Sequence, residues 1–217
     1  EKVLALGDFL ERGRALLQGG SATLARELFE KGMLWTDAPA LLRRWTYVAQ
    51  IAEDKTTADF KANFSEIEDL LAFIHNPAPN LERWSSALEY LEALAQGSRG
   101  MPPMASKGLD YLIEECEIFK HHEEAQSAYR DRNFSQSVKN YGKVLEKLEN
   151  TSEEMQKSIQ REIGDIAKER RRIEAQKNNY ESAKKKYTEV KNTLRVGQYK
   201  EAVSLADKAY KIYHATR

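Results

Sequence analysis

The residues closest to a chemical site are Cys116, Glu117, His121 and His122. Glu117 and His121 would share one face of a helix, and their carboxylate and imidazole groups are ligands of a kind that binds metals. The other interpretation, which we favour, is an exposed polar face beside a small buried thiol. The chain also lacks a Gly-rich phosphate loop, paired metal-binding cysteines and a zinc-protease motif. We therefore expect no enzyme, no catalytic or metal-binding residue and no cofactor.

Two basic runs could contact phosphates, Arg170-Arg171-Arg172 and Lys184-Lys185-Lys186. Residues 155–217 hold 16 Lys or Arg against 8 Asp or Glu, although the whole chain is neutral. Such a surface suits nucleic acid or anionic lipid. However, glutamates are interleaved at distances that permit ion pairs along a helix, which favours a solvated helix face. They are Glu169, Glu174, Glu181 and Glu189.

Composition indicates the type of element that must position these residues. The 217 residues include five prolines and eleven glycines, too few for the frequent turns of an all-β fold, so we predict an all-α class. The single cysteine cannot form an internal disulfide. No apolar run reaches the length of a membrane span, so we expect a soluble protein without a transmembrane segment. The chain opens with Glu1 rather than methionine, as an excised fragment or a processed terminus would, and this leaves cytoplasmic and exported locations both open.

A break in periodicity suggests two domains. Short helices are expected up to residue 97, separated by turns that include 55–57 and 76–79. The run from Gly97 to Ser106 contains two glycines and Pro102-Pro103 without helical periodicity. We therefore predict a domain at 1–97, a linker at 98–107 and a second domain at 108–217.

The second domain is expected to contain one long helix at about 151–196. Thr151-Ser152-Glu153-Glu154 fits a capping box that starts it. Apolar residues then follow at seven-residue intervals, at Ile159, Ile166, Ile173, Tyr180, Tyr187 and Leu194. Polar residues fill part of the companion row, which favours packing within the chain over a dimeric coiled coil and leaves the oligomeric state open. A degenerate repeat that turns at Gly164 is the alternative to a continuous helix.

Three segments share one arrangement of small, large and aromatic residues. Its first copy is Gly13, Leu16, Gly20, Ala25, Phe29 and Gly32; the others are Ala125, Ala128, Arg132, Phe134, Ser137, Tyr141 and Val144, then Val190, Thr193, Gly197, Tyr199, Ala202, Ala206 and Ala209. Antiparallel helices cross closely where small residues meet, and a glycine permits the reversal between them. The pattern resembles the tetratricopeptide repeat (TPR), a helical hairpin of about 34 residues that stacks into a solenoid.

The resemblance implies a groove that binds an extended peptide or a helix of a partner protein. Placed by its frame, the groove residues would be Arg14 and Leu17, then His122, Gln126, Tyr129 and Arg130, then Tyr187, Lys191 and Arg195. The family's asparagine and lysine clamp for a terminal carboxylate is not reproduced, because Arg14, Gln126 and Lys191 stand at the asparagine places. The basic members favour an acidic ligand.

Our leading hypothesis is therefore a scaffold or adaptor that binds another protein. Nucleic-acid or anionic-membrane binding through the basic C-terminal helices is the alternative, and we consider nucleic acid the less favoured partner.

Overall fold

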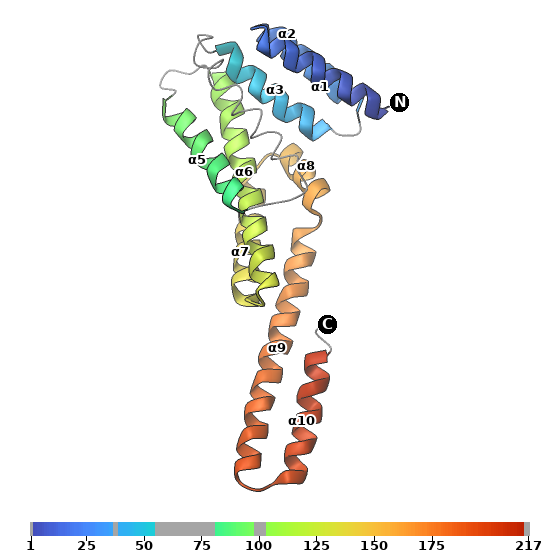
Figure 1. Cartoon of the computed structure of the whole chain (residues 1–217), viewed down its shortest axis with the longest axis vertical. Coiled ribbons are helices and arrows are strands. Elements are labelled where there is room, and N and C mark those ends of the chain that lie inside the picture. Colours follow the sequence, from blue (N-terminus) through green and yellow to red (C-terminus); the bar gives the residue numbers. More distant parts are fainter. Residues whose placement is uncertain (1, 37–38, 55–80, 98–102, 215–217) are drawn as a thin grey trace. The chain divides into compact units, whose positions relative to one another are not determined.

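The computed structural model describes residues 2–36, 39–54, 81–97 and 103–214 (Figure 1). Every regular element in these ranges is an α-helix, which confirms the all-α class. The helices are α1 Lys2–Gln18, α2 Ala22–Met33, α3 Pro39–Asp54, α5 Leu81–Gly97, α6 Pro103–Arg130, α7 Phe134–Asn150, α8 Glu153–Ile163, α9 Ile166–Arg195 and α10 Tyr199–His214. The turns predicted at 55–57 and 76–79 lie outside the described residues.

The described helices include none that is both long enough and apolar enough to cross a bilayer.

The chain divides into two compact units. Unit 1 comprises residues 1–123 and 153–159, and unit 2 comprises residues 124–152 and 160–217. This division differs from the boundary predicted at 98–107. Residues 98–102 are outside the described part, but residues 103–107 belong to α6. Pro103 occupies the first position of this helix, where a proline is compatible with helical structure.

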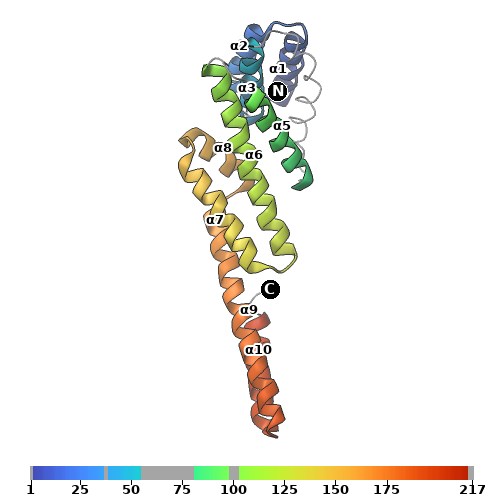
Figure 2. The same ribbon diagram turned by 90° about the vertical axis from the view of Figure 1, so that its left-hand side faces the viewer.

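In unit 1, helix α2 packs against both α1 and α3 (Figure 2). The fully buried Phe29 of α2 lies between Gly13 of α1 and Trp45 of α3, with its ring centroid 5.9 Å from that of Trp45. A Cβ atom at Gly13 would lie only 2.1 Å from Cε1 of Phe29. Glycine is therefore required for this approach of the two helices.

Two further contacts join α6 to the other helices of unit 1. Arg44 of α3 donates two hydrogen bonds to the carboxylate of Glu115, at 2.9 and 3.0 Å, and both side chains are buried. Trp84 of α5 stacks on Phe119 of α6, with 5.1 Å between ring centroids. An ion pair and an aromatic stack thus hold α3 and α5 to α6.

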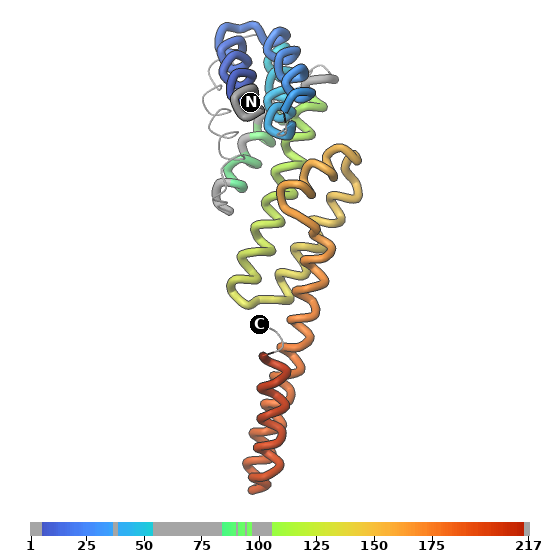
Figure 3. Tube along the Cα trace, turned by 90° about the vertical axis from the view of Figure 1, so that its right-hand side faces the viewer, coloured from blue at the N-terminus to red at the C-terminus, as the bar shows by residue number. Residues whose placement is uncertain are grey.

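In unit 2, helix α9 is the common support of α7 and α10, which both pack along it (Figure 3). Helix α7 covers the first half of α9, and α10 runs antiparallel beside the second half. The predicted long helix at 151–196 is wrong as a single element, because the chain breaks between α8 and α9. Gly164 adopts a φ of +79°, and the carboxylate of Asp165 accepts from the backbone N–H of Lys168 to cap the new helix.

Three hairpins turn in the same way. Gly20, Arg132 and Gly197 have φ of 80°, 58° and 79°, between α1 and α2, α6 and α7, and α9 and α10 respectively. In each turn, the N–H of this residue donates to the carbonyl three residues back, and the next N–H donates to the carbonyl five residues before it. This is the Schellman arrangement that closes a helix with a left-handed residue.

Three positions of each predicted frame are buried inside its hairpin. Counted from the left-handed turn residue, the buried positions are the seventh residue before it and the fifth and twelfth residues after it. In the second hairpin, Ser137 Oγ also donates a hydrogen bond to the carbonyl of Ala125 at 2.8 Å. The buried residues are Gly13, Ala25 and Gly32, then Ala125, Ser137 and Val144, then Val190, Ala202 and Ala209. The three hairpins predicted from spacing are present, and their stacking as a TPR solenoid stays a prediction.

Candidate functional site

The last hairpin, α9 and α10, is held together by small side chains. Its buried residues are Ala183 and Val190 on α9 and Ala202 and Ala209 on α10. Small residues at these places let the two helix axes approach closely. Several larger apolar side chains of both helices remain exposed.

Six large apolar side chains of this hairpin are between 45% and 71% exposed. We call them the apolar face: Tyr187, Leu194, Val196, Tyr199, Val203 and Tyr210. Single exposed apolar residues are normal, but a cluster on one element makes that surface a candidate interaction site.

Helix geometry places these side chains on the same side of the hairpin. At about 100° per residue around the helix axis, the side chains of Tyr187 and Leu194 point about 30–50° away from the mean direction of the buried Ala183 and Val190 of α9. On α10, the mean direction of the buried Ala202 and Ala209 is the reference. The side chains of Tyr199, Val203 and Tyr210 point about 70–110° away from it, in the same sense as on α9 when each helix is followed from its N-terminus. In an antiparallel pair, equal senses of rotation lead to the same side of the plane that contains both axes. The apolar face is therefore one continuous surface.

The apolar face continues a stripe that another helix covers further up α9. Ile166 and Ile173 are buried in the half of α9 against which α7 packs. Tyr180, at the end of that half, meets the ring of Phe134 of α7 edge-on at 5.8 Å. Tyr187 and Leu194 follow at the same seven-residue interval, but they lie beyond Phe134, where α7 begins. The stripe therefore passes from covered to exposed within one helix.

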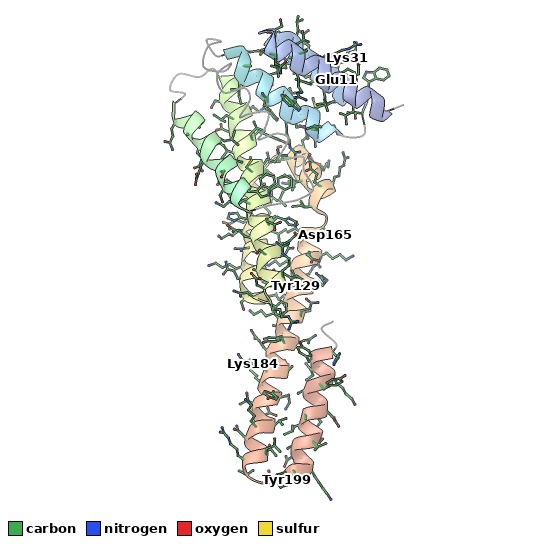
Figure 4. The ribbon with its side chains drawn as sticks, viewed as in Figure 1. Glu11, Lys31, Tyr129, Asp165, Lys184 and Tyr199 are labelled. Carbon is green, nitrogen blue, oxygen red and sulfur yellow. The ribbon has the colours of Figure 1, made fainter. Side chains whose placement is uncertain are left out.

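A line of cations borders the apolar face on α9. We call Lys177, Lys184, Lys191 and Arg195 the basic row. Three of them precede the stripe residues Tyr180, Tyr187 and Leu194 by three positions, so they lie beside the stripe on its outer side. Lys191 reaches back over Tyr187, with Nζ 4.9 Å from the ring centroid. Figure 4 shows Lys184 on the part of α9 beside α10 and Tyr199 at the turn between the helices.

The structure brings together the three predicted groove residues of the last hairpin. Tyr187 and Lys191 are in contact, and Arg195 lies one turn beyond Lys191 on the same helix. All three are exposed. The three residues therefore share one exposed flank of α9, and their role in a groove stays a prediction.

The predicted residues of the middle hairpin are less accessible. Tyr129 is half-buried, with its ring centroid 5.8 Å from that of Phe134 and the guanidinium carbon of Arg172 at 5.2 Å from its ring. Gln126 is also half-buried, whereas Arg130 is exposed at the end of α6. Tyr129 therefore serves mainly to join α6, α7 and α9 within unit 2.

The remaining predicted residues belong to unit 1. Arg14 is exposed, with its guanidinium carbon 5.7 Å from the ring centroid of Trp45, and His122 is half-buried on α6. Leu17 is only 2% exposed, so its placement on an accessible groove is wrong. It follows Gly13 by one helical turn, so it lies on the face of α1 that meets Phe29 of α2.

Cys116, Glu117, His121 and His122 all lie on α6. The described residues contain no group of three or more His, Cys, Asp and Glu side chains that could hold a metal ion. Cys116 is fully buried, and desolvation raises the pKa of its thiol well above the ordinary value, so the thiol stays protonated.

No protein-family model, curated protein or solved structure matches this chain.

Sequence reasoning missed the α10 half of the apolar face. In the repeat frame Tyr199 fills the aromatic place beside the helix crossing, whereas in the structure its side chain is 70% exposed. The usable signal was the spacing of Tyr199, Val203, Ala206 and Tyr210, which is that of one helix face. The frame does place Ala202 and Ala209 at the seam with α9, but it did not indicate that the larger residues of α10 would remain exposed beside them.

Proposed function

We propose that this protein is a scaffold or adaptor that binds a partner protein along the α9–α10 hairpin. The observation that carries the proposal is the apolar face itself, six large side chains on one side of a two-helix element. Leaving that much apolar surface in water is unfavourable, and burial against a partner would recover about 25 cal/mol for each Å² covered. The groove residues Tyr187, Lys191 and Arg195, expected from the repeat frame, fall on or beside this surface.

The test is site-specific photocrosslinking on the full-length chain. A benzophenone amino acid at Val203 would lie on the apolar face, whereas one at Ser204 would be exposed but turned away from it. We expect a discrete crosslinked protein from position 203 and none from position 204. Equal products from the two positions would reject the apolar face as the docking surface.

Binding of the crosslinked protein, once purified, then distinguishes the residues responsible. The double variant Tyr199→Ser/Val203→Ser removes apolar contacts from exposed positions and should weaken binding at least tenfold. The control variant Glu201→Ser/Ser204→Ala changes two exposed neighbours outside the apolar face and should bind normally. Far-UV circular dichroism of both variants checks that the helices are retained.

The alternative, binding of nucleic acid or anionic membrane through the basic helices, has its own signature. Residues 166–214 contain 13 Lys or Arg and 6 Asp or Glu, a net charge of +7. Part of this charge is paired locally, because Arg172 binds Glu169 and Lys186 binds Glu189 along the helix. Affinity for duplex DNA or anionic vesicles that falls steeply with salt and is unchanged in Tyr199→Ser/Val203→Ser would favour this alternative.

A further inference from the structure

We infer that the partner segment is an acidic amphipathic α-helix that lies along the groove between α9 and α10. The inference rests on the proposed function, because it names what the apolar face binds. Three features support it: the form of the face, the way the same stripe is covered elsewhere in the chain, and the charge beside it.

The form of the apolar face fits a helix. Tyr187 and Leu194 line one side of the seam, and Tyr199, Val203 and Tyr210 line the other, so the apolar side chains form two parallel ridges. Neighbouring helices pack at about 8–10 Å between axes, and the groove between two such helices accepts a third. Helix α10, which lines one side of this groove, has 16 residues and is about 24 Å long, which a partner helix of about 16–18 residues would match.

Unit 2 already contains an example of this packing. The first half of the α9 stripe is covered by a helix, α7, which runs along Ile166 and Ile173 as far as Tyr180. The second half carries the same seven-residue repeat of apolar residues. A helix on Tyr187 and Leu194 would continue the same mode of packing along the same stripe.

Charge specifies the chemistry of that helix. Three members of the basic row, Lys184, Lys191 and Arg195, lie along the α9 edge of the apolar face, so carboxylates on one flank of the partner helix would lie opposite them. A second copy of this chain would instead present the same basic row and a hairpin of the same net charge of +7. Like charges disfavour that arrangement, so the proposed partner is an acidic helix, which this hairpin of a second copy would not supply.

The experiment uses the full-length chain and two synthetic 18-residue helical peptides with the same leucine stripe. One carries glutamate at the flanking positions, and the other carries lysine at those positions. Fluorescence anisotropy at 150 mM salt measures both affinities. We expect the glutamate peptide to bind at least tenfold more tightly than the lysine peptide.

Charge reversal then tests the basic row. The variant Lys184→Glu/Lys191→Glu/Arg195→Glu should weaken binding of the glutamate peptide at least tenfold and strengthen binding of the lysine peptide. The matched control Lys185→Glu/Lys208→Glu/Lys211→Glu makes the same change in net charge at exposed positions off the apolar face, and it should leave the preference for the glutamate peptide intact. An equal loss in both variants would mean attraction by net charge alone and would overturn the inference.

The outcomes separate this inference from the proposed function. If both peptides bind equally and Tyr199→Ser/Val203→Ser weakens both, the apolar face binds proteins but the acidic helix is wrong. If neither peptide binds and photocrosslinking at Val203 yields no discrete product, the proposed function fails as well. Preferential binding of vesicles with 30% anionic lipid, with no binding of the glutamate peptide, would overturn the inference in favour of a membrane surface.

Discussion

The contact between Gly13 and Phe29 gives the sharpest test of how the hairpins nest. An alanine at position 13 would bring its Cβ to 2.1 Å and 2.2 Å from Cε1 and Cζ of Phe29. The ring is fully buried and is held on its other side by Trp45, so it must move by more than 1 Å to restore ordinary van der Waals contact, a distance of about 3.5–4.0 Å. Overpacking of this kind costs about 1–3 kcal/mol.

A helical alanine also gains about 1 kcal/mol over glycine, which partly offsets the clash. With the clash near the top of its range, Gly13→Ala should lower the free energy of unfolding by about 2 kcal/mol. In the background Phe29→Leu, which removes the two clashing ring atoms, the same substitution should raise it by about 1 kcal/mol. The sign should therefore reverse, with a coupling of about 3 kcal/mol between the two positions.

Urea unfolding followed by tryptophan fluorescence is the suitable assay, because all three tryptophans, Trp35, Trp45 and Trp84, belong to unit 1. Gly7→Ala is the control. It lies in the same helix with nothing within 4 Å of an added Cβ, so it should be stabilising in both backgrounds. Additive effects of Gly13→Ala and Phe29→Leu would refute the proposed nesting of the glycine against the ring.

Three other substitutions test features of the fold. Gly197→Ala should destabilise unit 2 by about 1 kcal/mol, because a side chain is strained at φ +79° although the space is open; thermal melting followed by circular dichroism measures it. Arg44→Met should cost about 3–5 kcal/mol because it leaves Glu115 buried without its charge partner, and Arg44→Met/Glu115→Met should recover most of that loss in urea unfolding. The Cys116 thiol should resist a thiol reagent until the protein unfolds. Because its pKa is raised in the folded state, its contribution to stability is complete below the unfolded pKa, about 8.5, and is lost as the pH rises above that value; comparing wild type with Cys116→Ala across this range measures it.

The sequence was most informative where small residues recur. Glycine or alanine at a helix crossing, followed by a turn residue at a fixed distance, predicted all three hairpins. The spacing of small residues predicted the α6–α7 hairpin even though its left-handed residue is Arg132 and not glycine. The small residues on both sides of the turn are sufficient to specify the helix crossing.

The sequence was least informative where apolar spacing alone had to separate a core from a surface. The seven-residue repeat from Ile166 to Leu194 is uniform, yet Ile166 and Ile173 are buried while Tyr187 and Leu194 are exposed. The difference depends on where α7 begins, a tertiary fact that no local pattern contains. Likewise, the polar residues around Gly164 allowed both a continuous helix and a break, and the cap by Asp165 decided the outcome.

The continuity of α9 has a mechanical consequence. Its 30 residues extend for about 45 Å without an intervening loop, with α7 fixed to one half and α10 to the other. An unbroken helix resists bending much more than a loop of the same contour length would. A displacement of α10 should therefore move α9 as one rigid helix. It would change the packing between α9 and α7 instead of being taken up by a flexible loop.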